Sequence, residues 1–143
     1  MFKLKKNTSI LIVEDEFIIA EDIRQICLNN GYGTVEISSK PEEVLFKVSS
    51  LKPDMILMDI CLNSDLDGVD LCSQIRSIST VPILFITAHA DSDTISRLKV
   101  YKPDGIIVKP YTDLGLIANI EIILHNVSKS RDAMRELMTT FFD

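Results

Sequence analysis

Five side chains that could take part in chemistry stand at the ends of short apolar runs in this sequence. They are Glu14, Asp15, Asp59, Thr87 and Lys109. The carboxyl ends of the strands in an open parallel sheet lie along one edge, and such sheets carry their function there. If the runs are neighbouring inner strands, three carboxylates, a hydroxyl and an ammonium group converge on that edge.

Each of these residues also has an ordinary explanation. An acid after a strand often caps the next helix and favours its positive end. A threonine at a strand end is commonly a turn residue, and a lysine there is commonly solvated. These explanations leave the coincidence on four of the runs unexplained, so we treat the residues as one candidate site.

The three carboxylates would repel one another by several kcal/mol unless a proton or cation lies between them. Their hard oxygens suit Mg²⁺, which keeps several waters and takes one or two carboxylates together with a phosphate oxygen. The acidic cluster therefore predicts a magnesium site formed by Glu14, Asp15 and Asp59.

Phosphoryl transfer to a carboxylate needs a nucleophile held in line, cations for the equatorial oxygens, and a donor for the remaining oxygen. Asp59 can be the nucleophile, while Mg²⁺ and the ammonium group of Lys109 supply the positive charge. The hydroxyl of Thr87 and the backbone N–H of Ala88 can donate to the third oxygen. The residue set is complete for this chemistry.

The elements that would position these groups alternate along the chain. Apolar runs that predict strands lie at residues 9–13, 34–37, 55–58, 82–86 and 105–108. Most are apolar without alternation, as in strands of a parallel sheet covered on both faces, and only TVEI alternates like an edge or half-exposed strand. Helical patterns follow each run, although the one near residues 93–102 offers mainly Ile95 and Leu98 for packing. The pattern predicts an α/β fold with a doubly wound, five-stranded parallel sheet and five helices.

Composition excludes several classes of function. The net charge of −6 argues against direct binding of nucleic acid, whose phosphates would repel the chain. No apolar run approaches the roughly 18 residues needed to span a membrane, and we expect no signal peptide. The three cysteines cannot all pair and form no C-x-x-C, which is simplest for reduced thiols in a cytoplasmic protein.

Five segments in register resemble the receiver domain of two-component response regulators. They are LIVEDE (11–16), ILMDI (56–60), DGVDL (67–71), LFITA (84–88) and IIVKP (106–110), and the resemblance covers roughly residues 8–126. It implies a flavodoxin-like, chemotaxis-Y-like sheet with strand order 2-1-3-4-5, in a receiver domain at residues 1–126.

The resemblance also implies a role for individual residues. Asp59 would be the phosphoacceptor and Thr87 would carry the switch hydroxyl. Lys109 would correspond to the invariant lysine of the family. Mg²⁺ would be held by Glu14, Asp15, Asp59 and the backbone carbonyl of Cys61. The peptide before Pro110 would be cis, turning the lysine inward. The phosphoryl donor would be a phosphohistidine on a sensor histidine kinase or phosphotransfer protein, and no separate substrate would be turned over.

Three features depart from the family pattern. Ile106 occupies the position of the usual aromatic switch residue, so transmission of the signal past Thr87 is open. The segment 61–67 lacks the common Met-Pro and is one residue longer. His89 lies two residues after Thr87, where it is either an exposed loop residue or an influence on water access to the site.

Residues 127–143 form an extension beyond the predicted domain. Continuing from the fifth helix into this extension, apolar residues recur at spacings of four and three. This is the heptad pattern of a coiled coil, and Arg131 is its one polar interruption. Two interpretations of this pattern stay open with equal weight: a helix folded back on its own domain or a frayed tail, and a helix that dimerises or leads into an output domain. The fifth helix is apolar on more than one face, so a homodimer through the fourth and fifth helices is a further hypothesis.

Other functions fit less well. A receiver-like interaction module without phosphorylation gains support only from Ile106. An aspartyl-nucleophile phosphatase would need a second acid two residues after the nucleophile, where this chain has Cys61. A flavodoxin-type flavin binder would need a phosphate loop after the first strand, where this chain has acids.

Overall fold

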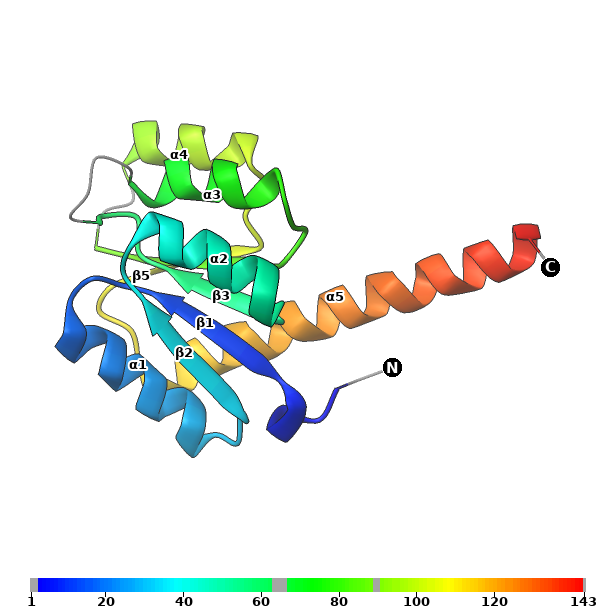
Figure 1. The fold of residues 1–143 in the computed structure, drawn as a ribbon, viewed down its shortest axis with the longest axis horizontal. Coiled ribbons are helices and arrows are strands. Elements are labelled where there is room, and N and C mark those ends of the chain that lie inside the picture. Colours follow the sequence, from blue (N-terminus) through cyan, green and yellow to red (C-terminus); the bar gives the residue numbers. More distant parts are fainter. Residues whose placement is uncertain (1–2, 63–66, 89–90, 143) are drawn as a thin grey trace.

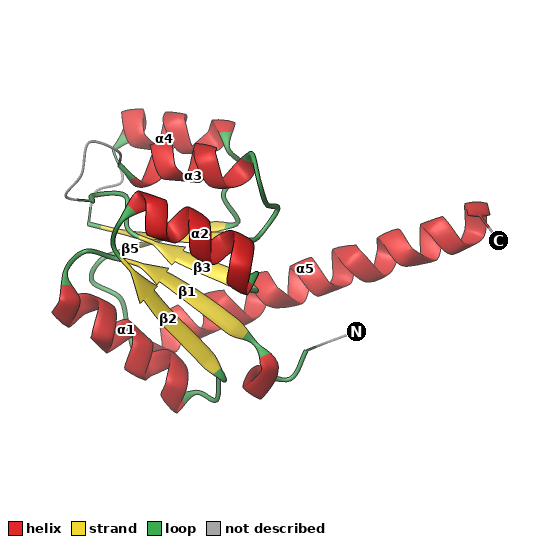
Figure 2. Cartoon of the chain, viewed as in Figure 1, coloured by secondary structure: helices red, strands yellow, loops and turns green. Residues whose placement is uncertain are grey.

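The computed structural model describes residues 3–62, 67–88 and 91–142. Five strands form one parallel sheet in the order β2-β1-β3-β4-β5 (Figure 2). They are β1 (Ser9–Val13), β2 (Thr34–Ser38), β3 (Met55–Met58), β4 (Ile83–Thr87) and β5 (Gly105–Val108). The predicted doubly wound sheet and its strand order are confirmed.

A helix follows each strand. The helices are α1 (Phe17–Asn29), α2 (Pro41–Leu51), α3 (Gly68–Arg76), α4 (Ser92–Val100) and α5 (Asp113–Phe142), and a short 3-10 helix, η1 (Lys5–Asn7), precedes β1. In Figure 1, α1 and α5 lie on one side of the sheet, and α2, α3 and α4 lie on the other.

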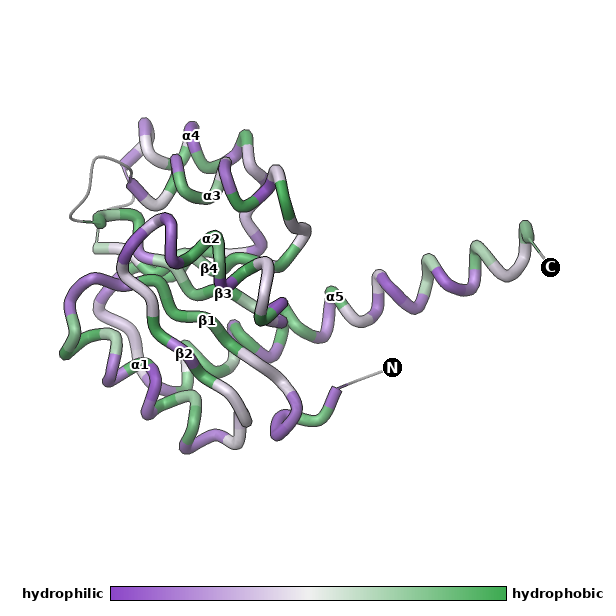
Figure 3. Tube along the Cα trace, in the orientation of Figure 1, coloured by the Kyte–Doolittle hydropathy of each residue, from purple (hydrophilic) through white to green (hydrophobic). Residues whose placement is uncertain are grey.

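Alternate residues along the strands pack into two separate hydrophobic cores, one on each face of the sheet. Ile10, Leu57 and Leu84 pack with α1 and α5, whereas Leu11, Ile56 and Phe85 pack with α2, α3 and α4. Because helices cover both faces, the inner strands are apolar apart from Ser9 and Thr87 at their ends, which explains the continuous apolar runs. Figure 3 shows this as strongly hydrophobic strands flanked by helices of mixed character.

The two edge strands differ in their sequence pattern. The alternating TVEI segment lies in β2, which is an edge strand as expected. Residues 105–108 form β5, the other edge, as the order 2-1-3-4-5 implies; this strand is only partly buried although its apolar run does not alternate. The apolar run there reflects contact with helices on its faces rather than a strand on each side.

Helix α4 is sparsely packed, as its few apolar residues predicted. Leu98 is its one buried residue, and Asp91 caps its N-terminus by accepting a hydrogen bond from the backbone N–H of Thr94. Arg97 on its outer side forms ion pairs with Asp67 and Asp70 at the start of α3.

Helix α5 is one continuous helix that runs back along the sheet and then past its end. Its buried residues, Leu116, Ile117, Ile120 and Ile123, all lie in its first half. The second half projects away from the domain (Figure 1), so the interpretation of the tail as a helix folded back on its own domain is wrong. No helix in the described ranges is long and apolar enough to cross a membrane.

Candidate functional site

Strand register brings the predicted residues to one edge of the sheet. Val13 pairs with Met58, and Met58 pairs with Phe85, so β1 and β3 end at the same level while β4 continues. The backbone N–H of Asp59 donates to the carbonyl of Val13 at 3.1 Å, which fixes the acid beside the end of β1. The local sequence therefore places each residue at a strand end, and the parallel pairing brings those ends together.

Asp59 lies at the centre of the site and is 8% exposed. Its Oδ1 accepts a hydrogen bond from the backbone N–H of Cys61 at 3.0 Å. Its Oδ2 accepts one from Nζ of Lys109 at 3.3 Å. One carboxylate oxygen of Asp59 is thus hydrogen-bonded to the segment that follows β3. The other lies beside the ammonium group of Lys109, the residue that follows β5.

Glu14 is buried beside Asp59, with only 4% of its surface exposed. Its Oε1 accepts a hydrogen bond from the backbone N–H of Glu16 at 3.1 Å, and its Oε2 lies 3.8 Å from Nζ of Lys109. The pKa of Glu14 is raised from 4.5 to about 8, first because burial disfavours the charged carboxylate and second because of its hydrogen bond to Asp59, while the N–H of Glu16 and the charge of Lys109 lower it by less. With both carboxyl groups ionised, the pair would carry more negative charge than Lys109 alone neutralises.

This surplus charge fits a divalent cation. The oxygens of Glu14, Asp15 and Asp59 are hard ligands, and a cation between them would replace the proton that Glu14 otherwise retains. Among the described residues, no group of three or more histidine, cysteine or acidic side chains is already gathered as a metal cage.

The remaining predicted residues lie around this pair. Thr87 is completely buried at the end of β4, and its carbonyl accepts a hydrogen bond from the backbone N–H of Lys109 at 2.8 Å. Asp15 is partly buried directly after Glu14, and Ala88 is exposed directly after Thr87. The peptide between Lys109 and Pro110 is cis.

Comparison with known proteins identifies the family and the fold. The family described as response regulator receiver domain matches residues 10–121 of the chain. This chain belongs to the response regulator receiver domain family. The receiver domain is a module of two-component signalling.

Curated relatives of this receiver domain are bacterial regulators. It is 32% identical over 137 residues to the transcriptional regulatory protein YvrH of Bacillus subtilis (strain 168), covering 95% of this chain and 57% of that protein. It is 36% identical over 118 residues to the response regulator ArlR of Staphylococcus epidermidis, covering 82% of this chain and 52% of that protein. The chain spans just over half the length of these relatives.

Solved receiver structures share the fold over most of the chain. A CheY-like response regulator receiver domain protein from Methanospirillum hungatei JF-1 superposes with a TM-score of 0.81 at 27% identity, covering 86% of this chain and 98% of that chain. The N-terminal domain of a response regulator/sensory box/GGDEF protein from Carboxydothermus hydrogenoformans superposes with a TM-score of 0.79 at 36% identity, with coverage of 86% and 98%.

Sequence reasoning gave no role to Gly68, although the matched segment DGVDL contains it. Its backbone N–H donates to the carbonyl of Ile60 at 2.8 Å. A Cβ atom at this position would lie 2.3 Å from the backbone oxygen of Asp59. Only glycine lets the start of α3 pack this closely against the phosphoacceptor candidate, and the adjacent Asp-Gly was the available signal.

Sequence reasoning also missed the ion pairs of Arg97. Its guanidinium group donates to both oxygens of Asp67, at 2.7 and 3.1 Å, and to Asp70 at 3.3 Å. Asp67 caps α3 one residue before Gly68, so α4 is tied to the element that packs on Asp59. No local pattern could indicate a partner 30 positions away in the sequence.

The departures from the family pattern have different outcomes. Ile106 is partly buried and packs against the core formed with α2, α3 and α4. His89 and residues 63–66 of the lengthened segment lie outside the described residues.

Proposed function

We propose that this receiver domain accepts a phosphoryl group on Asp59 from the phosphohistidine of a histidine kinase or phosphotransfer protein, in a Mg²⁺-dependent reaction. The observation that carries the proposal is the buried pair of Asp59 and Glu14, with Lys109 as their cation. This site has the nucleophile, the charge and the place for a second cation that phosphoryl transfer needs.

In the transfer, a carboxylate oxygen of Asp59 forms a bond to phosphorus while the bond between phosphorus and the imidazole nitrogen breaks. The imidazole leaves with the electron pair and takes up a proton from solvent. Glu14, Asp15, Asp59 and the carbonyl of Cys61 would hold Mg²⁺, which when bound would supply positive charge for the phosphoryl oxygens.

The chain's own residues stabilise the product. Lys109 pairs with one phosphoryl oxygen, and the hydroxyl of Thr87 and the N–H of Ala88 donate to another. Hydrolysis of the acyl phosphate returns the domain to its first state, so no separate substrate is turned over. The phosphorylated form differs from the unphosphorylated form in its partners or in its self-association.

The decisive experiment is phosphorylation by a small phosphodonor. Wild-type protein incubated with Mg²⁺ and acetyl phosphate is expected to gain the mass of one phosphoryl group, and EDTA should prevent the gain. Asp59→Asn should gain nothing, because an amide is not a nucleophile for this reaction. Absence of a gain in wild type would favour the alternative function, an interaction module without phosphorylation, which Ile106 supports.

A second prediction separates the roles of the two cations. Lys109→Ala should leave Mg²⁺ affinity within about threefold of wild type, because the lysine competes with the metal for the same carboxylates rather than binding it. It should weaken the conformational response to phosphorylation or beryllofluoride, followed by intrinsic fluorescence of the tyrosines or by NMR. Asp15→Asn is the matched comparison, and equal loss of Mg²⁺ binding in the two variants would contradict these roles.

A further inference from the structure

The outer half of α5 carries apolar side chains that the rest of the described chain leaves exposed. They are Met134, Leu137, Met138, Phe141 and Phe142, whose exposed fractions range from 50% to 77%. A helix of this length without tertiary contacts is marginal in water. Several large apolar side chains gathered on it indicate an interaction surface.

These exposed residues continue the stripe that α5 buries against its own sheet. Leu116, Ile120 and Ile123 are buried on the sheet. Met134, Met138 and Phe141 each come 18 positions later, which is five full turns at about 3.6 residues per turn. The two sets therefore point in the same direction from the helix axis, and the stripe runs on where the sheet has ended.

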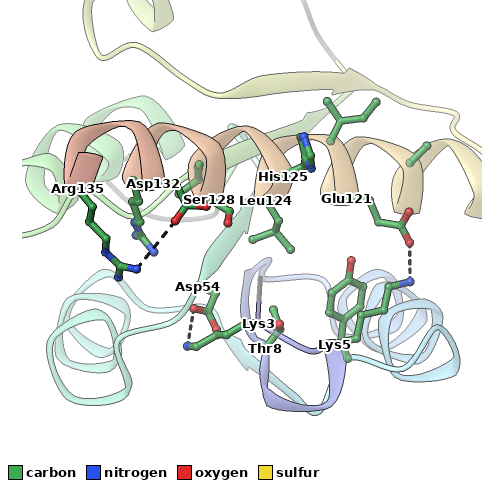
Figure 4. Close-up of a pocket in the computed structure, with 15 residues that line it drawn as sticks. Lys3, Lys5, Thr8, Asp54, Glu121, Leu124, His125, Ser128, Asp132 and Arg135 are labelled. Atoms are coloured by element: carbon green, nitrogen blue, oxygen red, sulfur yellow. Dashed lines mark hydrogen bonds and ion pairs between the residues drawn. The ribbon is translucent and has the colours of Figure 1, made fainter. Parts of the chain in front are cut away.

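A groove of about 720 Å³ lies where the stripe leaves the sheet. Its wall on the domain side includes Lys3, Thr8 and Asp54, from the end of the domain where β1 and β3 begin. Its wall on the helix side includes Leu124, Val127 and Arg131. Figure 4 shows the helix spanning this groove, with Lys3 and Asp54 paired across from Leu124.

We propose that a second copy of this chain binds here, with its α5 antiparallel to the first. A stripe of apolar residues is complementary to itself, so one surface can serve both copies of a closed two-fold dimer. With the two-fold axis near Met134, residues 127–142 of the helices overlap over about 24 Å. The end of each helix, with Phe141, then reaches the groove beside Leu124 and Val127 of the other copy.

The direction of the stripe excludes a straight parallel pair. In a parallel pair the partner helix would run along the same face of α5 toward residue 113. The domain's own sheet already occupies that face at Leu116, Ile120 and Ile123. An antiparallel partner ends at the groove and avoids this collision.

The proposed interface lies at the opposite end of the strands from Asp59, and it does not depend on the proposed phosphorylation. Sedimentation velocity and light scattering of the unphosphorylated chain should give twice the chain mass of 16.1 kDa. Met138→Glu should weaken dimerisation roughly tenfold or more, because it buries an unpaired charge. The matched control is Thr140→Glu, which adds the same charge about 200° around the helix from Met138 and should remain dimeric. A monomer or trimer of wild type, or equal loss in both variants, would overturn the proposal.

Cross-linking tests the direction of the helices. In a Cys61→Ser background, Phe141→Cys alone should not cross-link, because each Phe141 lies far from its own copy in an antiparallel pair. The double variant Val127→Cys, Phe141→Cys should form cross-linked dimers on mild oxidation. Efficient cross-linking of the single variant, or none in the double variant, would overturn the antiparallel arrangement.

Discussion

Glu14→Gln is expected to stabilise the metal-free protein strongly at alkaline pH. The pKa of Glu14 is about 8 in the folded protein and 4.5 in the reference state, so the folded protein binds the proton more tightly. The stability contributed by that proton is fully present below about pH 4.5 and is lost as the pH rises through 8. The difference in pKa corresponds to roughly 3–5 kcal/mol of unfolding free energy lost by wild type above pH 8.

Glutamine resembles the protonated carboxyl group at every pH, so the variant should lack this loss. Urea unfolding in EDTA at acidic, neutral and alkaline pH would measure the free energy of unfolding of both proteins. The two values should be alike at acidic pH and diverge as the pH rises. Glu16→Gln makes the same chemical change at an exposed position and should change stability by less than about 0.5 kcal/mol at all pH values. Parallel pH curves for wild type and Glu14→Gln would contradict the burial of Glu14 beside Asp59.

Magnesium adds a second readout to the same variant. Because Mg²⁺ replaces the proton as the neutralising group, it should stabilise wild type most at alkaline pH. Glu14→Gln lacks one of the proposed ligands and should be stabilised less. An equal effect of Mg²⁺ on both proteins would place the metal elsewhere.

Gly68→Ala is expected to lower the unfolding free energy by about 2–4 kcal/mol. The new Cβ would lie 2.3 Å from the carbonyl oxygen of Asp59 and 2.8 Å from Cα of Ile60. Both neighbours are backbone atoms, so the contact is relieved only by moving α3 or the segment that carries the phosphoacceptor candidate. Thermal unfolding measures the loss of stability, and acetyl phosphate labelling of the folded fraction measures the displacement of Asp59.

Gly33→Ala separates these two effects. Its Cβ would lie 1.8 Å from the carbonyl oxygen of Lys6, at the end of the domain away from the site. It should destabilise the fold comparably but leave the labelling rate of folded protein unchanged. If both glycine variants slow labelling equally, the close packing of Gly68 has no particular role in positioning Asp59.

The receiver fold could be predicted from the sequence because its determinants are local. Continuous apolar runs such as MILM indicate buried parallel strands, and the residue that follows each strand can be read directly from the sequence. The parallel arrangement then sends Asp59, Thr87 and Lys109 to one edge without further information. The apolar run of β5 does not by itself mark an edge strand, because such a run indicates helices on its faces and not strands at its sides.

The tertiary structure decided how these residues act on one another. The raised pKa of Glu14 depends on burial and on its distance from Asp59, two quantities set by chain segments far apart in sequence. The contact of Gly68 with Asp59 and the pairing of Arg97 with Asp67 arise in the same way, from packing between elements. A heptad pattern gave residues 127–143 a helical stripe, but only the docking of α5 on the sheet set the direction in which that stripe points.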